Sequence, residues 1–284
     1  MSVSPLRAQF IDQLRVKGYS ECTVENYVSA VAAVSRRFGK SPLLLTTDEV
    51  RQYLLHLLEE RKFAPATVNL HLDSIKTFFR LMAPASTVMG GFSHVKNGRR
   101  IPLVLSLAEC RRMIEVTTNL KHKAIIMVLC TAGLRLMECI NLKPRHIESE
   151  RMKIRVEQGK GKVDRYTILS EKTLVVLREY FRVYRPKEYL FEGDKEREPF
   201  GTRTVGYIVS KAARLAKIDK KVHPHTLRHS FATHLMEAGV PLPVIQRLLG
   251  HGSIKTSMIY VHVAQPLVDR TVCPLDMDRG VAHG

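Results

Sequence analysis

Helical spacing of hydrophobic residues dominates the first 83 positions of the chain. After Ser20, which can cap a helix N-terminus, apolar side chains recur three and four residues apart. Thr46 and Glu49 have the spacing of a capping box, and Pro65 stands where a further helix can open. Together with an earlier helical stretch at residues 9–16, the pattern predicts a compact unit of four helices.

The hydrophobic period stops over residues 84–104. This run is rich in glycine, proline, serine and arginine and shows neither a helix nor a strand period. Such a composition predicts a linker between two domains, and its basic end, Lys96 to Arg100, is suited to follow a phosphate backbone. Ser106 and Glu109 form a second capping box, where we expect a domain of residues 105–284 to begin.

The pattern of the second domain is mostly helical with one change of period. The apolar run Ala124–Cys130 ends at Gly133 and predicts a buried helix. Hydrophobic and charged residues then alternate up to Val156, and a second alternating stretch starts at Arg165, which predicts a β-hairpin. Helical spacing resumes from Glu171 and continues in the segments 205–216, 225–238, 244–249 and 253–260. The predicted fold class is mainly α, with a small hairpin or sheet, and residues from about 264 form a C-terminal tail.

The charge indicates a polyanionic partner. The 284-residue chain has a net charge of +18, and residues 1–104 carry 14 Lys and Arg against 8 Asp and Glu. The remainder carries 31 against 19, so both halves are basic and nucleic acid is the first candidate. No apolar run approaches the length of a membrane span, and the N-terminus lacks the apolar stretch of a signal peptide. The five single cysteines favour a reduced, cytoplasmic protein.

Five short stretches of the second domain carry side chains suited to phosphodiester chemistry. They are Gly133–Arg135, Gly159–Gly161, His225–Arg228, Leu249–His251 and Ile259–Val261. Guanidinium groups hold phosphate oxygens bidentately, and preorganised donors of this kind are worth roughly 10²–10³ in rate. A tyrosine hydroxyl can attack phosphorus and form a covalent ester, although its free pKa near 10 requires neighbouring cations or a base. Each stretch is weak alone, but in combination they predict phosphodiester transfer without a metal.

These stretches resemble the tyrosine recombinase or phage integrase family. The resemblance is strongest from His225 to Val263, where HTLRHSFATHL, LLGH and IYVHV stand in the family's order. The resemblance covers nearly the whole chain, and the spacing of His251 and Tyr260 is that of Xer-like members. It implies an N-terminal helical core-binding bundle of the SAM-like kind, residues 1–83, and a mostly helical catalytic domain. It further implies a C-shaped clamp on double-stranded DNA, recombination by a homotetramer on two sites, and a bacterial, nucleoid-associated protein without metal or cofactor.

The resemblance also implies roles for the residues around the scissile phosphate. Arg135 and Arg228 correspond to the pair that holds the phosphate, and Glu138 to the acidic residue that orders the site. The neighbours of Glu138 depart from the pattern, because Met137 and Cys139 stand where a small polar residue and a leucine are common. The departure concerns the packing around Arg135 rather than its role.

The reacting groups follow from the same resemblance. Tyr260 corresponds to the nucleophile that joins the 3′ phosphate, and Lys160 to the general acid for the leaving 5′ oxygen. His225 corresponds to an acid–base partner, and His251 to a group that hydrogen-bonds the phosphate or the tyrosine. Lys162 takes the role of Lys160 if the turn shifts by two residues. Among the other histidines, His223, His229 and His234 are expected to be structural or have no assigned role.

Three other interpretations remain open from the sequence. A DNA-binding accessory or regulatory protein without activity would have lost one of the five stretches, and a type IB topoisomerase would relax supercoils as a monomer. A metal-dependent nuclease using His225 and His229 would need carboxylate partners that the sequence does not supply at the usual spacing. The chain shows no additional N-terminal arm-binding domain, which favours a simple Xer-like role or a mobile element.

Overall fold

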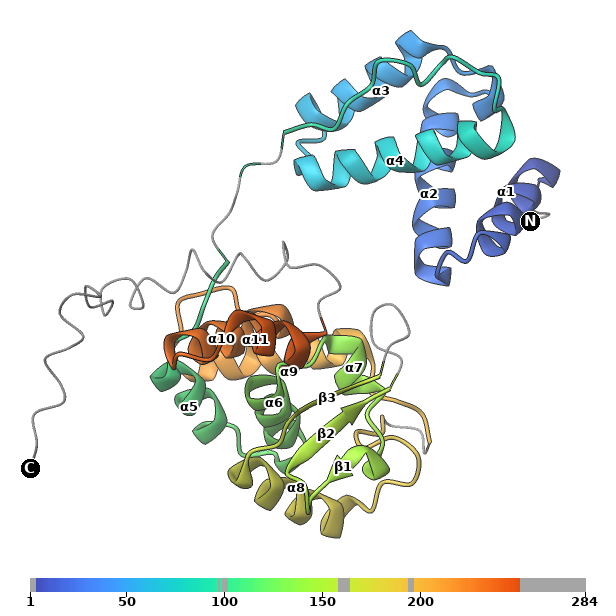
Figure 1. Ribbon diagram of the computed structural model, residues 1–284. Coiled ribbons are helices and arrows are strands. Elements are labelled where there is room, and N and C mark those ends of the chain that lie inside the picture. The colour runs from blue at the N-terminus through green and yellow to red at the C-terminus, as the bar shows by residue number, and fades with distance from the viewer. Residues whose placement is uncertain (1–3, 97, 99–101, 158–163, 194–196, 251–284) are drawn as a thin grey trace, which may run out of the picture. The chain divides into compact units, whose positions relative to one another are not determined.

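A computed structural model of the chain describes residues 4–96, 98, 102–157, 164–193 and 197–250. The chain divides into two compact units, residues 1–99 and 100–284. Figure 1 shows that helices make up most of both units and that a small sheet belongs to the second. Within the described residues, no helix has both the length and the apolar character needed to cross a membrane.

The N-terminal unit is a bundle of four helices, as the hydrophobic pattern predicts. The helices are α1 (Pro5–Val16), α2 (Glu21–Phe38), α3 (Thr47–Glu59) and α4 (Pro65–Met82), with a short 3-10 turn, η1 (Pro42–Leu44), before α3. Ser20 caps α2, and both hydrogen bonds of the Thr46–Glu49 capping box are formed. The first helix begins earlier than its apolar spacing indicates, because Ser4 caps it and Pro5 occupies its first turn.

Part of the run without a period packs on this bundle. The Asn69 side chain of α4 accepts from Val95 N at 2.8 Å and donates to Val95 O at 3.0 Å. Lys76, two turns further along α4, donates to Phe92 O at 2.7 Å. Several apolar side chains of residues 88–95 also contact the bundle core. Residues expected as linker therefore extend the N-terminal unit, held by bonds between positions 26 and 16 residues apart.

The second unit is built around one buried helix. Its helices are α5 (Leu107–Glu115), α6 (Leu120–Ala132), α7 (Leu136–Ile140), α8 (Glu171–Tyr184), α9 (Thr202–Leu215), α10 (Pro224–Glu237) and α11 (Leu242–Leu249), with a 3-10 turn, η2 (Pro144–His146). Six consecutive residues of α6, 124–129, are 0 to 6% exposed, and α6 contacts α5, α7, α8, α9 and α10. Figure 1 shows α6 among these helices. Gly133 ends α6 with a φ of 60°, as predicted.

A three-stranded antiparallel sheet flanks α6. Its strands, in the order β1-β2-β3, are β1 (Ile147–Glu148), β2 (Lys153–Val156) and β3 (Arg165–Ile168). The two predicted strands are present, with Val156 opposite Arg165, whereas the pattern did not predict β1, because two residues are too few to show a period. Ile154, Val156, Arg165 and Thr167 face inward. The turn 158–163 and the helix expected at 253–260 lie outside the described residues.

Candidate active site

The candidate site starts at the junction of α6 and α7. Arg135 is the residue before α7, and Glu138 lies three positions later, in the first turn. Glu138 accepts from Arg135 N and from Arg135 Nη1, both at 2.7 Å. This carboxylate therefore caps the helix and orients the arginine side chain at the same time. Met137 between them is 53% exposed, while Cys139 is 1% exposed, so the departures from the family pattern leave the bond intact.

A third residue, which sequence reasoning missed, completes the bonding of Glu138. Arg165 of β3 donates from Nη1 to Oε1 and from Nη2 to Oε2, each at 2.7 Å, which is a bidentate pair. Its side chain is 7% exposed and that of Glu138 is 8% exposed. A signal was present in the sequence, because the alternation of β3 places position 165 on the same face as the buried Thr167. A charged residue at an inward strand position requires a partner.

Arg228 of α10 approaches the same carboxylate from another side. It is 2% exposed, and its Nη1 lies 3.7 Å from Glu138 Oε2. Nη1 also donates to Gly133 O at 2.7 Å, which links α10 to the end of α6. A side chain at Gly133 would meet the ring of Phe231, so glycine is needed there both for close packing and for its positive φ. We call Arg135, Glu138, Arg165 and Arg228 the arginine–carboxylate cluster.

The cluster also binds the C-terminal end of α11. Three consecutive carbonyls each accept from a different arginine: Arg165 Nε to Leu248 O at 2.9 Å, Arg228 Nη2 to Leu249 O at 2.6 Å, and Arg135 Nη2 to Gly250 O at 2.9 Å. Carbonyls at a helix C-terminus carry partial negative charge, so cations stabilise them. The arginines from α7, β3 and α10 thus hold the backbone that leads directly into His251.

The electrostatics of the cluster favour an ionised Glu138. Burial alone would raise the pKa of this carboxyl, but the hydrogen bonds and charge of Arg165, followed by the bonds from Arg135, lower the pKa to about 2. Three guanidinium groups surround one carboxylate, so the cluster keeps a net positive charge. A site of this kind attracts a phosphate group.

His225 lies one helical turn before Arg228, at the start of α10, and its ring is exposed. Partial desolvation, then the charges of Arg228 and Arg135, lower the pKa of His225. The ring of His229 stacks on it at 5.7 Å between centroids, and burial, then His225 and Arg228, lower the pKa of His229 to about 4. Both imidazoles are therefore neutral at pH 7. His234 instead bonds Leu105 O at 2.8 Å, outside the cluster.

Four predicted residues lie outside the described part of the chain: Lys160, Lys162, His251 and Tyr260. The chain nevertheless connects three of these positions to the cluster. Residues 158–163 join the ends of β2 and β3, and Arg165 is in the first position of β3. His251 follows Gly250, whose carbonyl accepts from Arg135. Their catalytic roles stay predictions.

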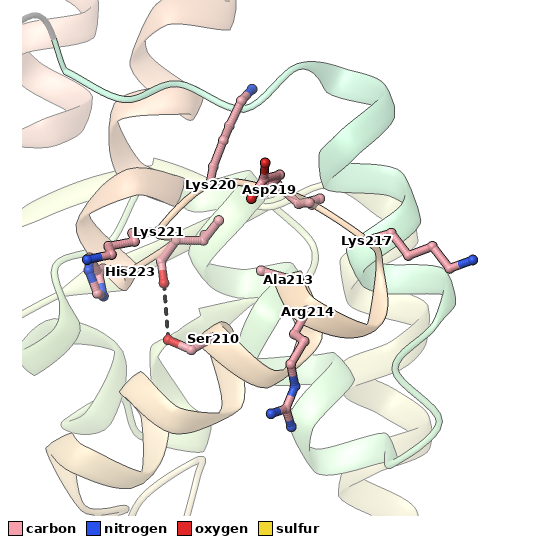
Figure 2. Close-up of a pocket in the computed structure, with 10 residues that line it drawn as sticks. Ser210, Ala213, Arg214, Lys217, Asp219, Lys220, Lys221 and His223 are labelled. Atoms are coloured by element: carbon pink, nitrogen blue, oxygen red, sulfur yellow. Dashed lines mark hydrogen bonds between the residues drawn. The ribbon is translucent and has the colours of Figure 1, made fainter.

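A separate basic pocket of about 490 Å³ lies where α9 ends and the chain turns toward α10. Arg214, Lys217, Lys220 and Lys221 line it, and Figure 2 shows the long side chains of Arg214, Lys217 and Lys220 pointing in different directions. Lys220 donates to Glu109 Oε2 at 2.8 Å. Cations that spread apart suit an extended polyanion rather than one phosphate group. Within the residues described, no three His, Cys, Asp or Glu side chains gather as metal ligands.

Comparison with known proteins assigns both units. Residues 104–266 match the phage integrase family, and residues 6–84 match the N-terminal SAM-like domain of phage integrases. A provisionally named integrase/recombinase of Sinorhizobium fredii, y4qK, is 38% identical over 97% of this chain and 90% of its own length. The tyrosine recombinase XerA of the archaeon Pyrococcus horikoshii is 30% identical over 92% of this chain and 90% of its own.

Solved structures agree with these matches. A crystal structure of XerA recombinase, 28% identical, aligns with a TM-score of 0.56 over 93% of this chain and 95% of that chain. A lambda integrase fragment, crystallised as a dimer on a COC′ core site, aligns with a TM-score of 0.74 over 92% of this chain and 95% of its own. At 20% identity the second likeness establishes the fold alone.

Proposed function

The chain belongs to the phage integrase family and is a site-specific tyrosine recombinase that breaks and rejoins DNA strands; we propose that Tyr260 is its nucleophile. In the proposed step the Tyr260 hydroxyl oxygen bonds to phosphorus as the bond to the 5′ oxygen breaks. Lys160, or Lys162 if the turn is shifted, gives that oxygen its proton. The strand is kept as a 3′-phosphotyrosine ester, and attack by a 5′ hydroxyl reverses the step.

The arginine–carboxylate cluster is the observation that supports this proposal most directly. Attack on a phosphodiester builds negative charge on the non-bridging oxygens, and fixed guanidinium groups stabilise that charge. We assign this role to Arg135 and Arg228, which Glu138 and backbone carbonyls hold on two sides. The lowered pKa of His225 keeps its imidazole neutral, so it can accept the proton of the nucleophile. His251, next to Gly250, completes the phosphate contacts.

The domain roles are part of the same proposal. The helical unit of residues 1–83 would bind one face of the DNA and residues 105–284 the other, with residues 84–104 between them. The basic pocket at the end of α9 supplies backbone contacts. We further propose a homotetramer on two sites, in which residues 264–284 dock on a neighbouring subunit. Relatives in bacteria and archaea are consistent with action on DNA in a bacterial cytoplasm, at the nucleoid.

Two experiments test the nucleophile and the assembly. Footprinting on genomic fragments identifies a bound site, and a duplex of that site with a nick beside the cleavage point traps the covalent complex on a denaturing gel. The complex should disappear in Tyr260→Phe and persist in Tyr166→Phe, a matched control because Tyr166 is 41% exposed on β3. A covalent band in Tyr260→Phe, or a band that requires divalent metal and is lost with EDTA, contradicts the proposal. Deletion of residues 268–284 should abolish synapsis but not DNA binding.

The other candidate functions give different results in the same assays. An inactive accessory protein would bind the footprinted site and form no covalent band with any variant. A topoisomerase-like enzyme would relax supercoiled plasmid as a monomer without joining two sites. Strand exchange between two labelled duplexes, with a tetramer by light scattering, separates the recombinase from both.

A further inference from the structure

Arg165 is a buried charged residue of the second unit. None of the roles that the family resemblance implies explains why it is buried. Its side chain is 7% exposed and lies on the inward face of β3, where hydrophobic residues are the norm. Placing a guanidinium there costs free energy unless every donor finds a partner. The partners that Arg165 has are therefore informative about what the residue does.

The guanidinium of Arg165 joins two parts of the site. Its two terminal nitrogens bind both oxygens of Glu138 at 2.7 Å, and its Nε donates to Leu248 O at 2.9 Å. Arg135 binds the same carboxylate and the carbonyl of Gly250. The three bonds of Arg165 thus parallel those of Arg135, and together the two side chains connect Glu138 to the end of α11.

Gly250 shows how closely Arg165 fits against that end. The glycine has a φ of 63°, and a Cβ there would lie 2.7 Å from Cδ and 3.0 Å from Nε of Arg165. The backbone can approach the guanidinium plane only without a side chain. The contact is therefore specific to this arginine and this glycine, and it fixes the direction in which the chain continues to His251.

The strand that carries Arg165 is itself anchored at both ends. Val156 pairs with Arg165 across β2 and β3, and Thr167 Oγ1 donates to Ala132 O, at the end of α6, at 2.8 Å. These paired positions are the last residue of β2 and the first residue of β3, which residues 157–164 connect along the chain. The bonds from Arg165 to Glu138 therefore also hold the end of β3 at which the segment containing Lys160 rejoins the sheet.

We propose that Arg165 is a positioning residue for recombination, which holds Glu138, the base of the Lys160 turn and the chain leading to His251 in one fixed arrangement. The inference rests on the proposed function, because it assigns Arg165 to the same reaction. All three guanidinium nitrogens of Arg165 already donate to Glu138 or Leu248, so we assign it no DNA contact and infer that it acts through Glu138 on Arg135. A lysine would keep the charge but lose the two-pronged bond and the third donor to α11.

The test compares Arg165→Met and Arg165→Lys with wild type on the nicked duplex of the footprinted site. Single-turnover experiments at saturating DNA give two numbers: the amplitude of covalent complex, which counts correctly folded protein, and its rate constant, which reports alignment. DNA affinity is measured in a Tyr260→Phe background, where no cleavage interferes. Arg182→Met is the matched control, because it removes an exposed guanidinium on α8, outside the arginine–carboxylate cluster and the pocket that adjoins Glu138.

We expect the rate constant of Arg165→Met to fall about 100-fold, the scale of a misaligned catalytic group, with DNA affinity within about threefold of wild type. The rate constant of Arg165→Lys should lie between those of wild type and Arg165→Met, and that of Arg182→Met should stay within about twofold of wild type. If Arg165→Met does not fold, Arg165→Lys carries the same comparison. A variant that loses amplitude but keeps the wild-type rate constant has only a folding defect and overturns the inference.

A pH profile separates positioning from folding independently. Three guanidinium groups contact Glu138: Arg135, just before α7, Arg165 of β3 and Arg228 of α10. Glu138 also lines a pocket of about 340 Å³, whose other titratable residues are Lys143, His146, Arg155, Glu157 and Tyr189. With Arg165 in place, the carboxylate stays ionised throughout pH 5–8. Without it, the largest contributions that lower the pKa are lost while the burial that raises it remains, so the pKa of Glu138 rises and the rate of Arg165→Met should be more sensitive to acid than that of wild type.

Failure of the proposed function and failure of the positioning role of Arg165 give different results. Absence of a covalent complex with wild type contradicts the proposed function and leaves no reaction for Arg165 to position. A normal wild-type complex with an Arg165→Met rate constant within threefold of it retains the function and removes Arg165 from the reaction. An affinity loss that accounts for the whole defect would place Arg165 in DNA binding and likewise overturn the inference.

Discussion

Replacing Glu138 with glutamine should destabilise the second unit by about 3 kcal/mol at pH 7. The carboxylate is 8% exposed and lies among three arginines, so its removal leaves buried positive charge without compensation. The pKa of about 2 is roughly two units below that of an exposed glutamate, and each unit corresponds to about 1.4 kcal/mol. Loss of one partner from a buried ion pair typically costs about 3–5 kcal/mol, which agrees with this value.

The lowered pKa of Glu138 also determines how the stability of the second unit depends on pH. Because the folded-state pKa is lowered, the stabilisation from Glu138 is fully present above the unfolded pKa, near 4.5, and is lost as pH falls toward about 2. The difference between wild type and Glu138→Gln should therefore be constant from pH 8 to pH 5. It should shrink steadily below pH 4.5, because Glu138 of the unfolded wild type takes up a proton in this range while the folded state stays ionised, and the variant does not titrate.

Urea unfolding is followed by far-UV circular dichroism, because the chain contains no tryptophan whose fluorescence could be used. This signal reports on the whole chain. Hydrogen exchange of peptides from α6 and α7 reports the second unit by itself. Glu179→Gln is the matched control: Glu179 is exposed on α8, and its replacement should change stability by less than about 0.5 kcal/mol. A loss below about 1 kcal/mol for Glu138→Gln, or a difference that does not change between pH 7 and pH 3, would refute the reasoning.

Four further predictions concern the fold and the reaction. Gly133→Ala should lower the melting temperature, because its Cβ would overlap an aromatic ring of α10 and because alanine disfavours the φ of 60° at this position. Gly206→Ala is the control: it has open space around it in α9 and should be neutral or stabilising by about 0.5–1 kcal/mol. Lys160→Ala should slow cleavage by about 10²–10⁴ and be rescued by a duplex with sulfur at the leaving 5′ position, which needs no proton; equal loss on both duplexes would remove its acid role. Lys221→Ala should reduce the slope of log affinity against log salt by about 0.9 if it contacts one phosphate, and an unchanged slope excludes that contact. Because the pKa of His225 lies below its ordinary value of 6.5, the midpoint of any acid-side loss of the single-turnover cleavage rate should lie below pH 6.5, and a midpoint at or above 6.5 would contradict a neutral base.

Local patterns were sufficient to predict most of the helices. Ser20 and Thr46 cap the helices that follow them, and Gly133 ends α6, because capping depends on residues a few positions apart. The alternation around Ile154 likewise identifies β2. The bond between Arg135 and Glu138 follows from their spacing of three, so its presence is visible in the sequence itself.

Contacts between distant positions were not predictable in this way. Arg165 is buried because Glu138, 27 residues earlier, neutralises it, and no period within β3 reveals that partner. The bonds from Asn69 to Val95 span 26 residues and give order to a stretch whose composition is typical of a linker. The alignment of three arginines on consecutive carbonyls of α11 likewise depends on how α7, β3 and α10 pack, which is tertiary information.

The docking of α11 by three arginines has a consequence for tracing lost activity among related genes. Because these arginines secure helix ends and balance a buried carboxylate, a descendant that abandoned catalysis would still need them to fold. Selection for stability alone would preserve them, while the position of Tyr260 would be free to drift. An intact set of arginines therefore identifies a folded member of the lineage, whereas the reacting groups proposed above, Tyr260 and Lys160, would distinguish a working enzyme from a silent one.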